Sequence, residues 1–78
     1  MNDYIPVGCD IYSRYELAIL RQHRLRVSWR DATDQLHVDV LRPRNLITRN
    51  HAEFMLAERS DGIEMELRLD RIVKTQAL

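Results

Sequence analysis

Two stretches in the first half of the chain alternate strictly between apolar and polar residues. Successive side chains of a β-strand point to opposite faces, so this period of two is typical of a strand with one buried face. The polar residues 31–34 separate the stretches and are suited to a turn, so the sequence predicts a β-hairpin here. The alternating apolar positions are Leu25, Val27 and Trp29 in residues 24–30, and Leu36, Val38 and Val40 in residues 36–40.

Two further strands are expected before residue 60. Pro43 has no amide hydrogen to donate to a neighbouring strand, so it predicts a break after the hairpin. A short third strand is expected at residues 46–49 and a fourth at residues 53–58. The fourth contains four consecutive apolar residues, Phe54 to Ala57, which indicates burial on both faces and a place in the middle of the sheet.

The most regular alternation lies at residues 63–69, after a turn at Ser60 to Gly62, and predicts the fifth strand. At residues 71–73 the alternation slips by one, which indicates a bulge or bend of the kind that helps small barrels to curl. The predicted fold class is therefore mainly β with one N-terminal α-helix: a small Sm-like β-barrel of about five antiparallel strands. An OB-like barrel, or a meander packed on a helix, fits the same periodicity.

A helix is expected after an irregular lead-in at residues 1–9, and it should end near Gln22. Ser13 and Glu16 have the spacing of a capping box, whereas Asp10 is a competing N-cap that would start the helix three residues earlier. Helical spacing then gives one apolar stripe that should pack on the sheet. The stripe consists of Ile11, Tyr15, Ala18 and Ile19.

The chain has 78 residues, enough for one compact domain over residues 1–78, with residues 74–78 expected as a tail. The formal net charge is zero, which gives no sign of a phosphate-rich partner. Cys9 is the only cysteine and fits a reducing compartment. No secretory signal and no stretch long enough to span a membrane are found. We therefore expect a cytoplasmic protein that does not bind membranes.

Motifs for catalysis are absent from the sequence. It contains no nucleophile elbow, phosphate-binding loop, dinucleotide fingerprint or zinc-protease motif. The histidines are scattered as His23, His37 and His51, which gives no local zinc-ligand spacing. Cys9 has no neighbouring histidine that could activate it. We expect no enzymatic activity, no metal and no cofactor.

Taken as a whole, the chain resembles the Rof family, also called YaeO, of inhibitors of Rho-dependent transcription termination. The resemblance covers about residues 2 to 73 and depends on three segments found in this order. They are Tyr4-Ile5-Pro6-Val7 with Cys9-Asp10-Ile11-Tyr12 and Glu16-Leu17-Ala18; Leu46-Ile47-Thr48-Arg49 with Glu53-Phe54; and Glu66-Leu67-Arg68-Leu69-Asp70-Arg71-Ile72.

The resemblance implies an Sm-like barrel whose partner is the transcription termination factor Rho, a hexameric RNA-dependent ATPase and translocase. Such a protein binds the N-terminal RNA-binding domain of Rho and blocks RNA loading. Carried over to this sequence, the implied contact residues lie at the helix start and in one polar loop. They are Asp10, Tyr12, Ser13 and Glu16, joined by Arg49 and Asn50.

Each implied contact residue also has a structural interpretation. The three polar helix residues can cap the helix, the tyrosine can pack partly on the barrel, and the loop pair can form a solvated turn. The chain also departs from the family, whose members often carry further acidic residues before Glu16. Ile11, Ser13 and Arg14 occupy that stretch here, which weakens the case for a mainly electrostatic contact.

The alternative function is an Sm-like module that binds RNA directly. Its main support is a basic run, yet the strand arginines of that run can pair with Asp39 or Glu64 across the sheet. Few aromatic residues remain for base stacking once Trp29 and Phe54 enter the core. We therefore expect no direct nucleic-acid binding, and the short, charged strands favour a monomer. The basic run consists of Arg21, Arg24, Arg26 and Arg30.

Overall fold

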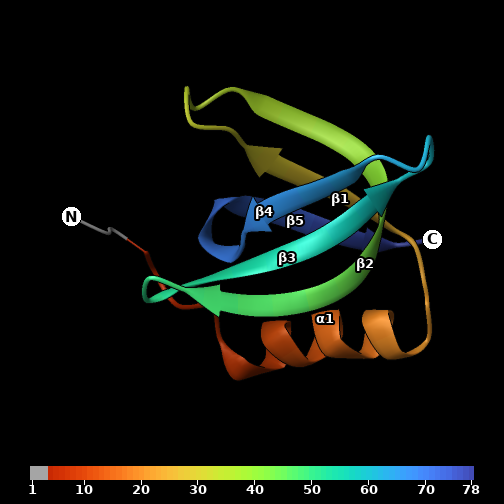
Figure 1. The fold of residues 1–78 in the computed structure, drawn as a ribbon, viewed down its shortest axis with the longest axis horizontal. Coiled ribbons are helices and arrows are strands. Elements are labelled where there is room, and N and C mark those ends of the chain that lie inside the picture. The colour runs from red at the N-terminus through yellow and green to blue at the C-terminus, as the bar shows by residue number, and fades with distance from the viewer. Residues whose placement is uncertain (1–3) are drawn as a thin grey trace.

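The computed structural model describes residues 4–78 and contains one helix packed against one curled sheet (Figure 1). Neighbouring strands are all antiparallel, in the order β4-β3-β2-β1-β5. The predicted fold class, mainly β with one N-terminal helix, is confirmed. The elements are α1 (Cys9–Leu20), β1 (Leu25–Arg30), β2 (Leu36–Arg49), β3 (Ala52–Arg59), β4 (Glu64–Arg68), the 3₁₀ helix η1 (Leu69–Arg71) and β5 (Ile72–Ala77).

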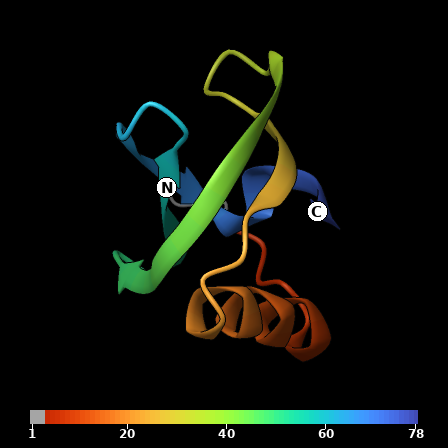
Figure 2. The ribbon, with the colours of Figure 1, turned by 90° about the vertical axis from the view of Figure 1, so that its right-hand side faces the viewer.

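The sheet is barrel-like but open. Its edge strands β4 and β5 lie at opposite ends of the strand order, and within residues 4–78 no ladder joins them. α1 packs against β2 on one side of the curled sheet (Figure 2). No helix in this described part of the chain is long and apolar enough to cross a membrane. Residues 1–3 of the expected lead-in lie outside the described residues.

The helix starts earlier than either predicted N-cap. α1 begins at Cys9, and Gly8 is its N-cap, with an extended backbone and no side-chain capping bond. The Tyr12 amide already donates to the Gly8 carbonyl over 3.0 Å. The predictions that Asp10 caps the helix or that Ser13 begins a capping box are therefore wrong. The glycine takes the extended entry conformation itself, which leaves Asp10 in the first turn, near the positive end of the helix dipole.

The helix end has a closed geometry that fixes its length. Gln22 adopts a left-handed conformation with a φ of 56°. Its amide donates to the Ile19 carbonyl over 3.2 Å, and the His23 amide donates to the Ala18 carbonyl over 2.9 Å. These two bonds form a Schellman motif, which satisfies carbonyls that would otherwise be left without donors.

The face of α1 that packs on the sheet is rotated from the predicted stripe. Tyr15 and Ala18 are buried as expected, and Ile19 is half-buried. Ile11, however, is 39% exposed, so its predicted burial is wrong. Tyr12 takes its place and packs against the core. The whole stripe is therefore turned toward β2, the strand that α1 contacts most.

β2 runs without interruption through the predicted break at Pro43. The ladder to β3 shifts register between Pro43 and Asn45, and this irregularity accommodates an extra residue. By the alternation of bonded and non-bonded pairs along β2, the residue at position 43 turns its backbone amide away from β3. Pairing with β1 ends at Leu41, so the donor that Pro43 lacks has no ladder partner there. Pro43 is also fully buried and adds to the core. The predicted break, and with it a separate third strand at residues 46–49, is wrong.

The phase slip near residue 71 marks a real bend. η1 follows β4 directly and turns the chain into β5. β5 pairs with β1, so residues 74–77, expected as a tail, form the outer neighbour of a central strand. With neighbours on both sides, β1 can bury Val27 completely. The prediction of a tail was wrong because strand pairing depends on a partner that lies far away in sequence.

Candidate partner-binding surface

The polar residues of the helix start form one row on the outside of the fold. Asp10, Ser13 and Glu16 are three positions apart, so they follow one another along a helix face. All three are exposed. Because the helix is capped by Gly8 without any side-chain bond, the capping roles considered for them do not apply. We call these three residues the helix-start row.

Tyr12 lies at the edge of a groove between α1 and β2. The groove has a volume of about 400 Å³ and a mixed apolar and polar lining. Tyr12 is half-buried, which fits both interpretations of it: its ring contacts the core while part of it faces the groove. Glu16 is the acidic residue of the lining. The full lining is Tyr12, Glu16, Ile19 and Leu20 from α1, and Asn45 and Leu46 from β2.

Two tyrosines meet one carboxylate beside this groove. The Tyr4 hydroxyl donates a hydrogen bond to Glu53 Oε1 over 3.2 Å. Burial, followed by that hydrogen bond, raises the pKa of Tyr4 to about 12. Burial also raises the pKa of Tyr12, and the negative charges of Glu53 and Glu16 raise it further. Both phenols therefore stay protonated near neutral pH and can act as donors.

Sequence reasoning did not include Tyr4 or Glu53 among the candidate site residues. Both nevertheless lie within the segments that carry the family resemblance. Their connection is not visible locally, because 49 positions separate them in the chain.

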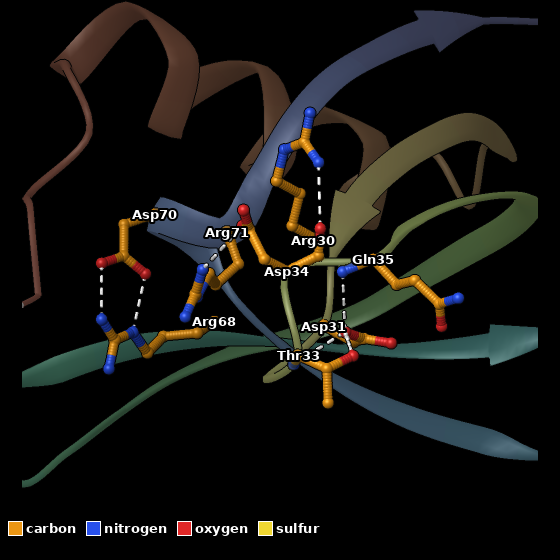
Figure 3. A network of polar contacts seen from close by, with 8 residues as sticks. All are labelled: Arg30, Asp31, Thr33, Asp34, Gln35, Arg68, Asp70 and Arg71. Carbon is orange, nitrogen blue, oxygen red and sulfur yellow. Dashed lines mark hydrogen bonds and ion pairs between the residues drawn. The ribbon is translucent and has the colours of Figure 1, made fainter.

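The lead-in is tied to the far end of the chain. The Ile5 amide donates to Asp70 Oδ2 over 3.0 Å. Arg68 donates to the same carboxylate from Nε over 2.7 Å and from Nη2 over 2.8 Å (Figure 3). The Arg68 bond lowers the pKa of Asp70, with the Ile5 amide adding to the effect. The Arg68 guanidinium also lies 5.7 Å from the centre of the Tyr4 ring, so one arginine supports both contacts of the lead-in.

The loop pair of the candidate set lies at the β2–β3 turn. Asn50 and His51 have φ values of 52° and 64°, as a tight type I′ hairpin turn requires. Arg49 forms an ion pair with Glu66 of β4 and lies 4.8 Å from the centre of the Phe54 ring. These partners hold the Arg49 guanidinium toward β4. The structure thus gathers the helix residues but directs Arg49 elsewhere. Asn50 lies in an exposed turn, and the Arg49 side chain at the end of β2 is 52% exposed.

One arginine of the basic run, Arg30, and two arginines outside it contact acidic or carbonyl groups. Arg30 donates to the Asp34 carbonyl over 3.1 Å, and Arg71 lies 3.7 Å from a carboxylate oxygen of the same aspartate (Figure 3). Asp39, expected to pair with the arginines of the first strand, instead lies 3.8 Å from Arg59. These contacts compete with phosphate for the arginine donors.

Comparison with known proteins adds information about the fold alone. The chain matches no family model, and no curated protein matches its sequence. Its structure is similar to that of proteasome accessory factor B/C (PafBC) of Arthrobacter aurescens, with a TM-score of 0.78 over 96% of this chain and 18% sequence identity. The match covers 12% of the PafBC chain, so this protein corresponds to a small part of that one. The shared class is a small β-rich domain.

Proposed function

We propose that this protein is an antiterminator that binds the N-terminal RNA-binding domain of Rho in the cytoplasm and blocks RNA loading. The observation that carries the proposal is the helix-start row beside the groove at Tyr12. It presents two carboxylates and a hydroxyl on a rigid helix, and no capping role occupies them. Inhibition of this kind requires occupancy of a site and no chemistry, so the protein does not act as an enzyme.

The chemistry of the row suits a surface that normally holds RNA. Such a surface offers cationic and hydrogen-bonding groups to phosphates and bases. Asp10 and Glu16 can accept bonds from those groups. The Tyr12 hydroxyl, whose proton is directed at Glu53, can accept one through its oxygen. The groove beside them adds apolar area from Ile19 and Leu46, which a purely electrostatic competitor would lack.

The anchoring of the lead-in favours tight binding. The bonds from Tyr4 to Glu53 and from Ile5 to Asp70 fix the segment that precedes α1. A surface that is already ordered loses less conformational entropy when it binds. The helix-start row carries only two acidic residues, Asp10 and Glu16, so binding should depend only weakly on salt, because long-range steering is reduced.

The direct test is an RNA-dependent ATPase assay of the host's own Rho, titrated with this protein. We expect inhibition that added RNA relieves. Tyr12→Ala and Glu16→Ala should each weaken inhibition about tenfold, as expected for the central residues of an interface. Glu64→Ala is the matched control, because Glu64 is an exposed glutamate on β4, outside this surface. Wild-type protein that neither inhibits nor binds Rho would overturn the proposal.

Direct RNA binding is the alternative to be excluded. It should depend strongly on salt, since each phosphate contact releases counterions. We expect no measurable affinity for single-stranded RNA at moderate salt. Submicromolar binding under those conditions would favour the RNA-binding function instead.

A further inference from the structure

β2 extends beyond the strand that pairs with its outer edge. Pairing with β3 begins at Leu41, opposite Arg59. Residues 36–40 pair with β1 on one side. On their other side, no strand of the described chain pairs with them. We call residues 36–40 the β2 projection; it forms the free upper rim in Figure 1.

The backbone groups of the β2 projection point outward in a defined pattern. The Asp31 amide donates to the Gln35 carbonyl over 3.0 Å, which makes these two residues a hydrogen-bonded pair. Bonded and non-bonded pairs alternate along an antiparallel ladder. In the register of β1 and β2, the amides and carbonyls of Leu36, Val38 and Val40 therefore face away from β1. Consistently, the Val40 amide donates instead to Asp39 Oδ1 over 2.7 Å.

The side chains of the projection are apolar on one face. Leu36 is 53% exposed and Val38 is 57% exposed, although their alternation is the pattern of a buried strand face. An exposed strand edge with apolar side chains is a template for pairing with another strand. Short, charged strands are the reason to expect a monomer, but this edge carries little charge. Asp39 is the only acidic residue of the β2 projection, and Arg59 lies near it.

The projection is held in place before any partner arrives. The His37 ring stacks on Trp29 with 5.4 Å between ring centres, and its Nε2 lies 2.6 Å from Asp31 Oδ2. In the turn, Asp31 Oδ1 accepts bonds from the amides of Thr33 and Gln35 (Figure 3). Pairing at this edge therefore requires little further ordering.

We propose that the β2 projection pairs with the β2 projection of a second copy of this chain, forming a two-fold symmetric dimer. An antiparallel pair centred on Val38 places Val38 opposite Val38 and Leu36 opposite Val40. It also places His37 of each copy opposite Asp39 of the other. An imidazole therefore faces a carboxylate at two symmetry-related positions. The segment is complementary to itself, as an interface around a two-fold axis requires.

The register of this pair is determined by the same residues. A two-fold axis at Leu36, Val38 or Val40 passes through a hydrogen-bonded pair, and one at His37 or Asp39 passes through a non-bonded pair. A centre at His37 or Asp39 would pair only two outward residues of each strand and would place two imidazoles or two carboxylates opposite each other. A centre at Leu36 or Val40 would shorten the paired segment and place a partner strand against the turn or against Arg59. Centring on Val38 keeps the whole projection paired. The contact is short, so we expect a weak dimer that forms at high concentration.

The dimer and the proposed function use different surfaces. α1 lies on the opposite side of the molecule from the β2 projection (Figure 2), and the groove is lined by α1 and by Asn45 and Leu46, which are outside the projection. Loss of dimerisation therefore need not affect Rho binding, and failure of Rho binding would not affect the dimer.

The test is sedimentation of the purified chain from about 10 μM to about 1 mM, a range that spans weak association. Val38→Lys places two ammonium groups opposite each other and should weaken the dimer at least tenfold. Leu36→Lys, a second exposed substitution, should weaken it as well. Val73→Lys is the matched control, because Val73 is 58% exposed on β5 and should leave the dimer unchanged.

The geometry is tested separately by isotope-filtered NMR on a mixture of labelled and unlabelled copies. We expect intermolecular contacts between the methyl groups of Leu36 and Val40. A chain that stays monomeric throughout the range, a dimer equally sensitive to Val38→Lys and Val73→Lys, or intermolecular contacts at another surface would each overturn the proposal. So would a strand from a different protein pairing with this edge while the chain itself remains monomeric.

Discussion

The two halves of β2 belong to one strand, yet they have different surroundings and opposite phases: Leu36 and Val38 are exposed at even positions, whereas Leu41 and Pro43 are buried at odd positions. Residues 41–49 pair with β3, and α1 packs against β2. Leu41 is fully buried. In the β2 projection, Leu36 is half exposed.

In the register of the hairpin, Leu36, Val38 and Val40 lie opposite Arg30, Ser28 and Arg26, so their alternation does not mark the face that β1 buries. Alternation indicates a strand, whereas the face that is buried depends on which elements lie above and beside it.

The largest difference in stability is expected when one leucine is replaced in each half of β2. Leu41→Ala should lower the free energy of unfolding by about 2–5 kcal/mol, because it leaves a cavity among buried side chains. Leu36→Ala should change it by less than about 0.5 kcal/mol, because its side chain already contacts water. Urea denaturation followed by tryptophan fluorescence measures both. Equal losses would mean that something covers the β2 projection.

A smaller effect is expected where the lead-in is anchored. Asp70→Asn removes the charge that Arg68 and the Ile5 amide bind, and should cost about 1–3 kcal/mol. Arg68 lowers the folded-state pKa of Asp70, so this stabilisation is present at neutral pH. It is lost as the pH falls below about 4 and through the lowered pKa.

Urea denaturation of wild type and Asp70→Asn at pH 7 and in acid checks this effect. The difference between the two proteins should shrink as the pH falls. Arg71→Gln is a control that leaves the carboxylate bonds of Asp70 to Arg68 and Ile5 intact. A difference that does not depend on pH would contradict the assigned cause.

The smallest effect is expected in the hairpin turn. Asp31→Asn weakens the contacts to His37, Thr33 and Gln35, which together hold the pKa of Asp31 far below its usual range. The hairpin should open locally more often at neutral pH, with little change in global unfolding. Amide hydrogen exchange near residues 33–37 measures this opening. Equally faster exchange in β3 would show that the turn is not an independent unit.

Much of the fold could be predicted because its signals are local. The alternation located β1, the start of β2 and β4, and the phase slip located the bend at η1. The missed features depend on distant partners. β5 is a strand because β1 lies beside it, and Pro43 is tolerated because its backbone faces the side of β2 on which pairing with β1 has already ended. The residues within a few positions of either feature do not indicate these distant partners.

The candidate site shows the same difference between local and distant causes. Asp10, Ser13 and Glu16 share a row because helical spacing alone places them there. Arg49 is directed away by Glu66, which is 17 positions further along the chain and reaches it only through the sheet.

The bond between Ile5 and Asp70 also bears on how the protein becomes active during synthesis. It spans 65 positions, and β5, which completes the pairing of β1, follows the other strands of the described residues. Contacts so distant in sequence form late, because the intervening chain must be ordered first. The segment that precedes α1 is therefore synthesised before these strands and yet is among the last parts of the fold to be fixed. A nascent chain can carry a complete α1 and still lack the anchored surface from which we expect inhibition.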